Sequence, residues 1–412
     1  MRTVERSIKR RRPRPAWTRN AGPVFAAVLA VVLAAGVARA QPAHLTPGEA
    51  QAGAIEPEPP TVELLTFGVG ARIFEKFGHA ALCLAYHQPE HPEVCFNYGV
   101  TDFSAGGAMV WHFLRGEQRF WVEPTRLTTM LAFYRGEDRD IWRQTLPISG
   151  EAARAVEARL WSDVQEEHRY YNYDHFFDNC ATRLRDVIDQ ATGGALSSGA
   201  DVHHSRTFRE LGRRGLAGMP LLLLTSDLVT GRELDQHPTM YQAMFYPEIL
   251  RTEVALRLHA RPELIYRRRG PPFPTRGDTG RLHFLAVAVA LAVPLFLAYS
   301  RRRHQTAALW AVSVALGLLG AIVWAVAIAS SIPAVRYNEA VFVVMPLDLA
   351  LPLLSPVWRR RYARARIGVL GVFSALALVG VFRQPLWIVV LAVALPMATI
   401  AFDLPHGRQR AA

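Results

Sequence analysis

The chain has 412 residues, half of them hydrophobic, and a formal net charge of +12 at pH 7. This length allows two domains and a sizeable core. The excess of arginine does not indicate a nucleic-acid-binding protein, because the clusters flank apolar segments, as in export signals and at the cytoplasmic ends of membrane spans. These clusters lie at 10–14, 267–269, 301–303 and 359–366.

The N-terminal part predicts export from the cytoplasm. Residues 1–40 combine a basic start, an apolar run and an A-R-A sequence that ends at residue 40. This pattern is typical of a secretory signal peptide with its cleavage site, and an uncleaved membrane anchor is the alternative. Residues 41–60 are rich in Pro, Ala and Glu without periodicity, which predicts a disordered linker.

Residues 61–260 have the mixed pattern of one α+β domain. The alternation of apolar and polar residues predicts strands at 61–70, 77–86 and 94–100, with a turn at 87–93. Helical patterns follow at 150–168 and from Cys180 onward, and then an apolar segment at 218–229 and a helix at 238–250. Residues 261–282 are predicted to be a linker, because much of this stretch is rich in Pro, Gly and Arg.

The C-terminal part, residues 283–402, predicts a transmembrane helical domain. Most of its apolar segments approach the about 20 residues that span a bilayer; the five are 283–299, 307–329, 340–356, 367–382 and 385–402. The arginine clusters place the loop at 330–339 and the α+β domain outside the cytoplasm, with the tail 403–412 inside. The signal peptide predicts the same sidedness independently.

The stretch from 171 to 189 predicts a helix whose first turn contains Cys180. Asp178 and Asn179 are good N-cap residues, and Leu184, Val187 and Ile188 recur as on one buried helix face. Unpaired N–H groups at a helix start favour negative charge, so we expect a thiolate to form more easily there. A buried structural cysteine is the alternative.

The other two cysteines lie on neighbouring predicted strands. A hairpin turn centred on Pro89 places Cys83 opposite Cys95. In an exported protein a cross-strand disulfide fits this geometry, and two separate thiols are the alternative. With the disulfide formed, Cys180 stays unpaired, and a free thiol in an oxidising compartment is usually a reactive one.

The same register predicts which side chains share a face of the hairpin. One face carries small and polar residues, namely His79, Ala81, Cys83, Ala85, Cys95, Asn97 and Gly99. We expect this face to receive the Cys180 helix, so that the thiol meets the imidazole of His79 and Asn97 holds the second ring nitrogen. A core histidine and a strand-end asparagine are the alternatives.

These residues also support a family resemblance. FGHAAL at 77–82 and DNCATRLRD at 178–186 follow the order of circularly permuted papain-like enzymes, which include the lecithin:retinol acyltransferase type and the NlpC-like group. KFGHAAL, NYGVTDF, YNYDHFFDNCATRLRD and QAMFYPEIL more closely resemble the family named for the Lnb N-terminal periplasmic domain. The resemblance covers about 61–255 and extends to IPAVRYNEAVFVVMPLDL, where the chain departs from the pattern at Pro333, Ala340 and Val341.

The resemblance implies a permuted papain-like periplasmic α+β domain followed by an all-α bundle of about five transmembrane helices in the bacterial inner membrane. The best-known activity of the family is lipoprotein N-acylation. By that analogy, Cys180 would attack a membrane phospholipid ester to form a thioester, with His79 as the base and Asn97 as the third catalytic residue. The acyl chain would then pass to the α-amino group of a diacylglyceryl-cysteine lipoprotein.

Further residues are candidates for substrate binding. Tyr173, His175 and Arg183 lie close to Cys180 in sequence, with structural roles as the alternative. Asn338 and Glu339, together with Asp348, are candidates to recognise a polar head group. The scattered histidines lack the spacing of a metal site, and no nucleotide-binding motif occurs, so we expect neither metal nor cofactor.

Two other classes of function remain open. A peptidoglycan amidase or endopeptidase of the same fold would use Cys180 for hydrolysis, although such enzymes rarely need five spans. A non-catalytic membrane sensor would function without Cys180 or His79.

Overall fold

The computed structural model describes residues 58–88, 91–102, 107–198, 201–274 and 281–402. The predicted signal peptide, most of the linker at 41–60 and the tail at 403–412 lie outside the described residues.

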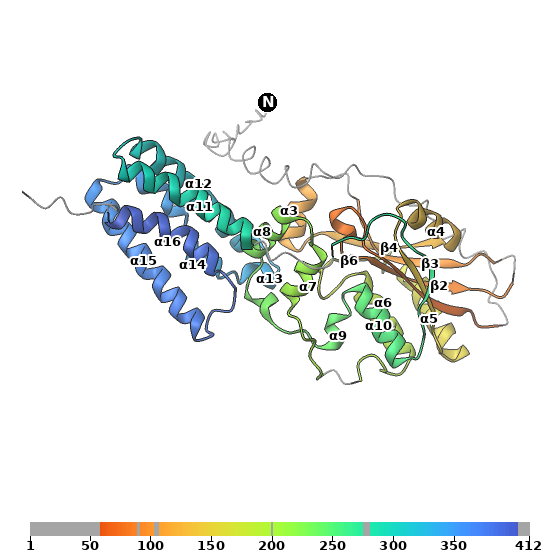
Figure 1. Ribbon diagram of the computed structural model, residues 1–412. Coiled ribbons are helices and arrows are strands. Elements are labelled where there is room, and N and C mark those ends of the chain that lie inside the picture. Colours follow the sequence, from red (N-terminus) through yellow and green to blue (C-terminus); the bar gives the residue numbers. More distant parts are fainter. Residues whose placement is uncertain (1–57, 89–90, 103–106, 199–200, 275–280, 403–412) are drawn as a thin grey trace, which may run out of the picture.

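A seven-stranded antiparallel sheet forms the centre of the α+β part (Figure 1). Its order is β6-β4-β3-β2-β1-β5-β7. The strands are β1 Thr61–Phe67, β2 His79–Ala85, β3 Val94–Val100, β4 Arg119–Arg126, β5 Ile141–Thr145, β6 Tyr170–Asn172 and β7 Glu263–Tyr266. The first three correspond to the predicted strands. Strand β7 lies within the stretch predicted as a linker, so the sheet continues beyond residue 260.

In chain order the helices of this part are α3 Gly107–Arg115, α4 Leu127–Gly136, α5 Gly150–Asp163, α6 Cys180–Ala191, α7 Phe208–Gly215, α8 Pro220–Val229, α9 Met240–Ala243 and α10 Pro247–Arg257, with 3-10 turns η2 Ile73–Glu75 and η4 Arg232–Asp235. Helices α5, α6 and α10 pack on one face of this sheet and α4 packs on the other, whereas α8 packs against the C-terminal helices. The predicted helix at 150–168 ends at Asp163, and the predicted helix at 238–250 is divided between α9 and α10.

The packing of α6 differs from the sequence prediction. Its buried residues Leu184 and Ile188 join one core cluster with Leu82, Leu84 and Phe96 of the hairpin. The helix therefore lies on the face of large apolar side chains, where it buries more apolar area than the small-residue face offers.

The small-residue face is covered by α4 instead. Leu127 and Met130 of α4 pack against Ala81, Cys83 and Cys95 in a second cluster. Cys83 lies opposite Cys95 in the β2–β3 register, and a disulfide joins the two. Cys180 is the free cysteine of the part of the chain that the structure describes.

The C-terminal part is helical and lies beside the sheet domain (Figure 1). Its elements are α11 Arg281–Ser300, α12 Gln305–Ala329, α13 Pro333–Arg336, α14 Ala340–Val343, η5 Pro346–Leu353, α15 Pro356–Leu378 and α16 Trp387–Phe402. Two helices of the described chain, at Leu282–Ser300 and Gln305–Ala329, are long and apolar enough to cross a membrane.

The third apolar segment, 340–356, is not the continuous helix that the sequence predicts. Pro346 and Pro352 lack the backbone N–H that a helix needs, and the chain forms the short α14 and the 3-10 turn η5. This irregular backbone packs against α12, where a Cβ at Gly317 or Gly320 would collide with the backbone of the segment. The fourth segment also differs, because α15 begins at Pro356 and includes the arginine cluster.

Asp348 is fully buried within this segment and is paired. Its carboxylate accepts hydrogen bonds from Tyr362 at 2.6 Å and from Arg366 Nε at 3.1 Å. A buried carboxylate is stable when it is both paired and hydrogen-bonded. These contacts give Asp348 a structural role rather than the predicted role in head-group recognition.

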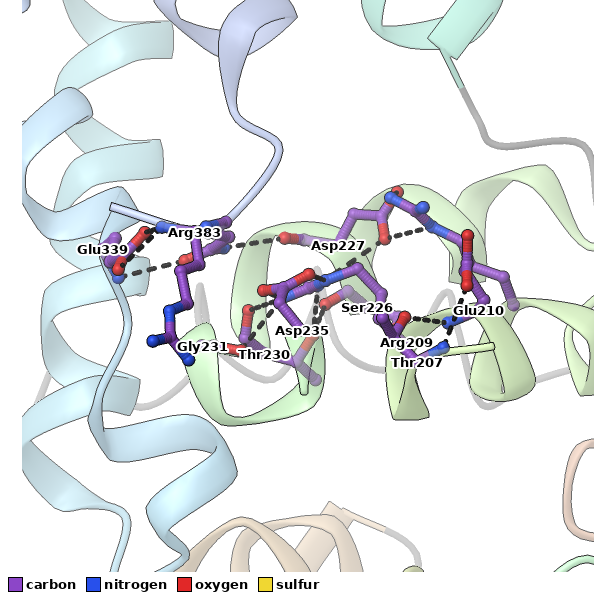
Figure 2. A network of polar contacts seen from close by, with 12 residues as sticks. Thr207, Arg209, Glu210, Ser226, Asp227, Thr230, Gly231, Asp235, Glu339 and Arg383 are labelled. Atoms are coloured by element: carbon purple, nitrogen blue, oxygen red, sulfur yellow. Dashed lines mark hydrogen bonds and ion pairs between the residues drawn. The ribbon is translucent and has the colours of Figure 1, made fainter. Parts of the chain in front are cut away.

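A polar network joins the two parts of the chain (Figure 2). The Arg209 side chain donates to Asp235, Thr230 and the carbonyl of Gly231. Across the junction, Gln384 Nε2 donates to the carbonyl of Asp227 at 3.1 Å. On the helical side, the Glu339 carboxylate accepts from the backbone N–H groups of Arg383 and Gln384 at 2.9 and 2.8 Å. The network fixes the loop after α8 against the loops at 330–339 and 383–386.

Candidate active site

The start of α6 is fixed by hydrogen bonds of its N-cap residue. Asn179 Oδ1 accepts from the N–H of Thr182 at 2.9 Å, and Thr182 Oγ1 accepts from the N–H of Asn179 at 2.8 Å. The amide of Asn179 also donates to the carbonyl of Phe245 at 2.9 Å. This reciprocal capping holds the first helical turn, and therefore Cys180, against the rest of the domain.

The Cys180 thiol lies where strands β2 and β3 separate. Their ladder runs from Leu84↔Val94 only as far as Leu82↔Phe96. Beyond that point the backbone N–H groups of Ala80, Ala181 and Cys180 itself lie near the sulfur and act to lower the pKa of the thiol. Three backbone donors at the sulfur form a site suited to negative charge.

His79 is the first residue of β2, directly before Ala80. The preceding Gly78 has φ +84°, and a Cβ there would lie 2.7 Å from the carbonyl oxygen of Phe67, so glycine is required at this turn. The imidazole is stacked with the rings of Phe67 and Tyr134, at centroid distances of 6.0 and 6.1 Å.

Asn97 on β3 orients the imidazole. Its Oδ1 lies 3.2 Å from His79 Nε2, and its Nδ2 donates to Thr125 Oγ1 at 3.0 Å. An amide oxygen only accepts, so Nε2 carries the proton and Nδ1 keeps its lone pair. This is the tautomer that a general base needs.

The thiol and the imidazole reach this point from opposite faces of the sheet. Cys180 packs with the core cluster beneath α6, whereas His79 stacks on Phe67 and Tyr134 in the cluster beneath α4. Because His79 directly precedes Ala80, whose backbone N–H lies near the sulfur, both groups belong to the same end of the strands. The sequence prediction placed α6 on the His79 face, and this was wrong.

The electrostatics favour a neutral thiol in the resting site. Burial raises the pKa of Cys180 to about 11, although the N–H of Ala80 and the charge of Arg139 act in the opposite direction. Burial and the charge of Arg139 lower the pKa of His79 to about 4, and the hydrogen bond with Asn97 opposes this shift less strongly. Desolvation therefore outweighs the effect of the helix start, contrary to the sequence expectation of an easily formed thiolate.

Arg139 is a charged residue of this site that the sequence reasoning missed. It is 2% exposed, donates from Nε to the carbonyl of Gly68 at 2.8 Å, and lies over the ring of Tyr134. Its Nη2 is buried without a hydrogen-bond partner in the described chain. The arginine follows no motif, and only the fold places it behind His79 and Cys180.

Of the predicted neighbours of Cys180, Tyr173 and His175 lie in the segment between β6 and α6, and Arg183 lies in α6 itself. Tyr173 Oη lies 3.3 Å from His175 Nδ1, and the Tyr173 ring stacks on Phe120. His175 packs edge-on against Phe77, and burial lowers its pKa to about 4. Arg183 binds both carboxylate oxygens of Asp178 at 2.6 and 2.9 Å.

Asn338 and Glu339 belong to the junction. Asn338 Nδ2 donates to the carbonyls of Leu228 and Val229, and its Oδ1 accepts from the N–H of Ala340. Both side chains are buried, and their polar atoms are bonded to the protein itself. Among the described residues, no group of three or more His, Cys, Asp or Glu could hold a metal ion.

Fold and site together define a class of protein: an α+β domain with a cysteine, a histidine and an asparagine at the end of its sheet, attached to apolar helices. Residues 49–214 match the family model of the Lnb N-terminal periplasmic domain. With its two candidate membrane helices, the chain is a membrane protein with a periplasmic domain. No curated protein and no solved structure matches the chain.

Proposed function

We propose that the protein is a membrane-bound lipoprotein N-acyltransferase. It moves an acyl chain from a phospholipid through a Cys180 thioester to the α-amino group of a diacylglyceryl-cysteine lipoprotein. The observation that carries this proposal is the Cys180 thiol beside the backbone N–H of Ala80, because the neighbouring residue is a histidine that Asn97 orients.

The chemistry begins from a neutral pair. As Sγ attacks the carbonyl carbon of the donor ester, His79 Nδ1 takes the thiol proton, so the charged thiolate never has to persist in the buried site. The imidazolium then gives this proton to the departing glycerol oxygen. Asn97 keeps the ring in the required tautomer throughout.

The second half-reaction uses the same groups in reverse. The α-amino group of the lipoprotein attacks the thioester carbonyl while His79 Nδ1 accepts its proton. Collapse of the intermediate forms the amide and returns the proton to Cys180 Sγ. An amide is more stable than a thioester, so this step is favourable. No cofactor or metal enters either half-reaction.

The helical part supports a substrate held in a membrane. We propose five passes through the bacterial inner membrane, of which the third is the irregular segment 340–356, with the domain at 61–260 in the periplasm and residues 1–40 as its signal peptide. Irregular backbone at membrane depth is tolerated where it is buried in protein, as it is against α12. The order of histidine strand before cysteine helix supports a permuted papain-like fold for the domain.

Mass spectrometry of a lipoprotein tests the proposal. The full chain would be expressed in cells depleted of their own lipoprotein N-acyltransferase, beside a Cys180→Ala variant. We expect the N-terminal peptide of a lipoprotein to gain one acyl chain with the native chain and none with the variant. A diacyl peptide in both strains, with both proteins present in the membrane, would refute the proposal.

The same strains separate the alternative functions. A peptidoglycan hydrolase would change the muropeptide composition in a Cys180-dependent way and leave the lipoprotein peptide diacylated. A non-catalytic sensor would produce no Cys180-dependent product of either kind.

A further inference from the structure

Tyr171 in β6 has a buried hydroxyl without a partner. The residue is 7% exposed, and its Oη forms no hydrogen bond within the part of the chain that the structure describes. Burying a hydroxyl in this state costs free energy, which a ligand that accepts its proton would recover. The orphaned hydroxyl therefore indicates a hydrogen-bond acceptor that arrives with the substrate.

The hydroxyl lies beside the proposed nucleophile. Gly99 on β3 has φ +95°, and a Cβ built there would lie 3.7 Å from Cys180 Cβ and 3.8 Å from Tyr171 Oη. The two groups therefore face the same point of the backbone, where the positive φ favours glycine. Because β6 pairs with β4, with Tyr171 opposite Phe120, the sheet itself holds the tyrosine in place.

The other polar side chains near Cys180 are less suited to this role. The Tyr173 hydroxyl is within hydrogen-bond reach of His175, and the Tyr134 ring stacks on Phe67 on the side of the imidazole. His175 Nε2 is also unpartnered, but its ring packs among Phe77, Phe176 and Phe245.

Arg183 prepares Tyr171 for donation. Its guanidinium lies 3.8 Å from the centre of the Tyr171 ring, and Asp178 holds it there by two hydrogen bonds. A cation over the ring face draws electron density from the phenol and makes its O–H a stronger donor. This contact accounts for Arg183 at the site without requiring it to touch the substrate.

We propose that Tyr171 is a catalytic residue that donates a hydrogen bond to the oxyanion, an inference that rests on the proposed acylation of Cys180. When Sγ bonds to the acyl carbon, the carbonyl π electrons move to oxygen, and the Tyr171 O–H binds that oxygen without giving up its proton. When the intermediate collapses, the electrons return, the C–O bond to the leaving group breaks, and the leaving oxygen takes the proton from His79.

Two reactions of the same thiol test this role. Acylation by p-nitrophenyl butyrate passes through an oxyanion, whereas alkylation by iodoacetamide is a direct displacement and forms none. Both rates would be measured on the full-length protein in detergent, for the native chain, Tyr171→Phe and Tyr170→Phe. Tyr170 is the matched control, because its ring contacts Arg119 and Trp121 instead.

We expect Tyr171→Phe to slow acylation by about 10²-fold or more, the usual effect of removing one oxyanion donor, with alkylation and the thermal midpoint unchanged. Tyr170→Phe should leave both rates at the native level. Equal acylation of Tyr171→Phe and the native chain would overturn the role of Tyr171 and leave the proposed function standing. A native thiol that is alkylated but never acylated would overturn both.

Discussion

Around Cys180 and around Glu339 the protein buries polar side chains in two different ways. At the junction, Arg209, Asp227 and Glu339 all find partners within the described chain (Figure 2). Asn338 also has a partner there, the carbonyl of Leu228. At the cysteine end of the sheet, Tyr171 Oη, His175 Nε2 and Arg139 Nη2 have none. The fully paired side chains of the junction have a structural role, whereas the unpartnered atoms near Cys180 leave hydrogen-bonding capacity for a ligand.

An unpartnered atom alone does not define the site. Glu63 and Thr66 on β1 also have buried atoms without partners among the described residues. What distinguishes the cysteine end is that such atoms lie around a free thiol, beside an oriented imidazole. The comparison therefore predicts that substitutions near Cys180 change activity, whereas substitutions in the junction change stability.

The largest expected effect on activity comes from His79. We expect His79→Gln to reduce acyl transfer by about 10²- to 10⁴-fold, because the amide keeps a hydrogen-bond donor for Asn97 but removes the base. Lipoprotein mass spectrometry and the thermal midpoint would be measured together. His168→Gln, on an exposed histidine, is the control and should match the native chain. Native activity in His79→Gln would remove His79 from the mechanism.

The largest expected effect on stability comes from Arg209. Arg209→Met leaves the buried carboxylate of Asp235 without its partner, and breaking a buried pair in this way typically costs about 3–5 kcal/mol. We expect a lower thermal midpoint and less protein in the membrane, with activity per folded molecule retained.

Arg214→Gln is the matched control for the junction. It removes a more exposed ion pair with Glu248, which is worth about 1 kcal/mol or less. If both variants had the same thermal midpoint, or if Arg209→Met lost activity while fully folded, the distinction between a structural junction and an active site at Cys180 would be wrong.

The sequence predicted much of the hairpin and little of its surroundings. Strand alternation and the turn at Pro89 were sufficient to predict β2, β3 and the register that brings Asn97 beside His79. The face that α6 covers depends on how well Leu184 and Ile188 fit between the side chains of strands that are distant in sequence. The rule that a face of small residues admits a helix gave the wrong face. The periodicity of a sequence does not show which face of a sheet a helix will cover.

Long-range contacts explain the other differences. Arg139 and Tyr171 lie in no motif, and their positions depend on the pairing of β1 with β5 and of β4 with β6. Asn338 and Glu339 looked like free polar residues at a membrane surface, because their partners at Leu228 and Gln384 are more than forty residues away in the sequence. The raised pKa of Cys180 likewise comes from burial by distant segments.

The pH dependence of alkylation tests the neutral state of the thiol. Because burial raises the pKa of Cys180 to about 11, the thiol stays protonated through neutral pH, and its thiolate fraction grows about tenfold per unit up to pH 10. The iodoacetamide rate should follow this slope. Cys83 and Cys95 do not interfere, since they form a disulfide. A plateau that begins below pH 8 would instead indicate a preformed thiolate–imidazolium pair.

The smallest expected effect is that of Arg139→Met, which tests whether the buried charge of Arg139 acts on the thiol of Cys180. This positive charge lowers the pKa of both Cys180 and His79, so Arg139→Met should raise both. At pH 8 the thiolate fraction falls, and alkylation should slow severalfold, while the slope of the rate against pH stays the same. Arg143→Met on β5, whose guanidinium pairs with Glu263 at the surface, is the control. An unchanged alkylation rate in folded Arg139→Met would assign its buried charge to structure, like the arginines of the junction, and not to the thiol.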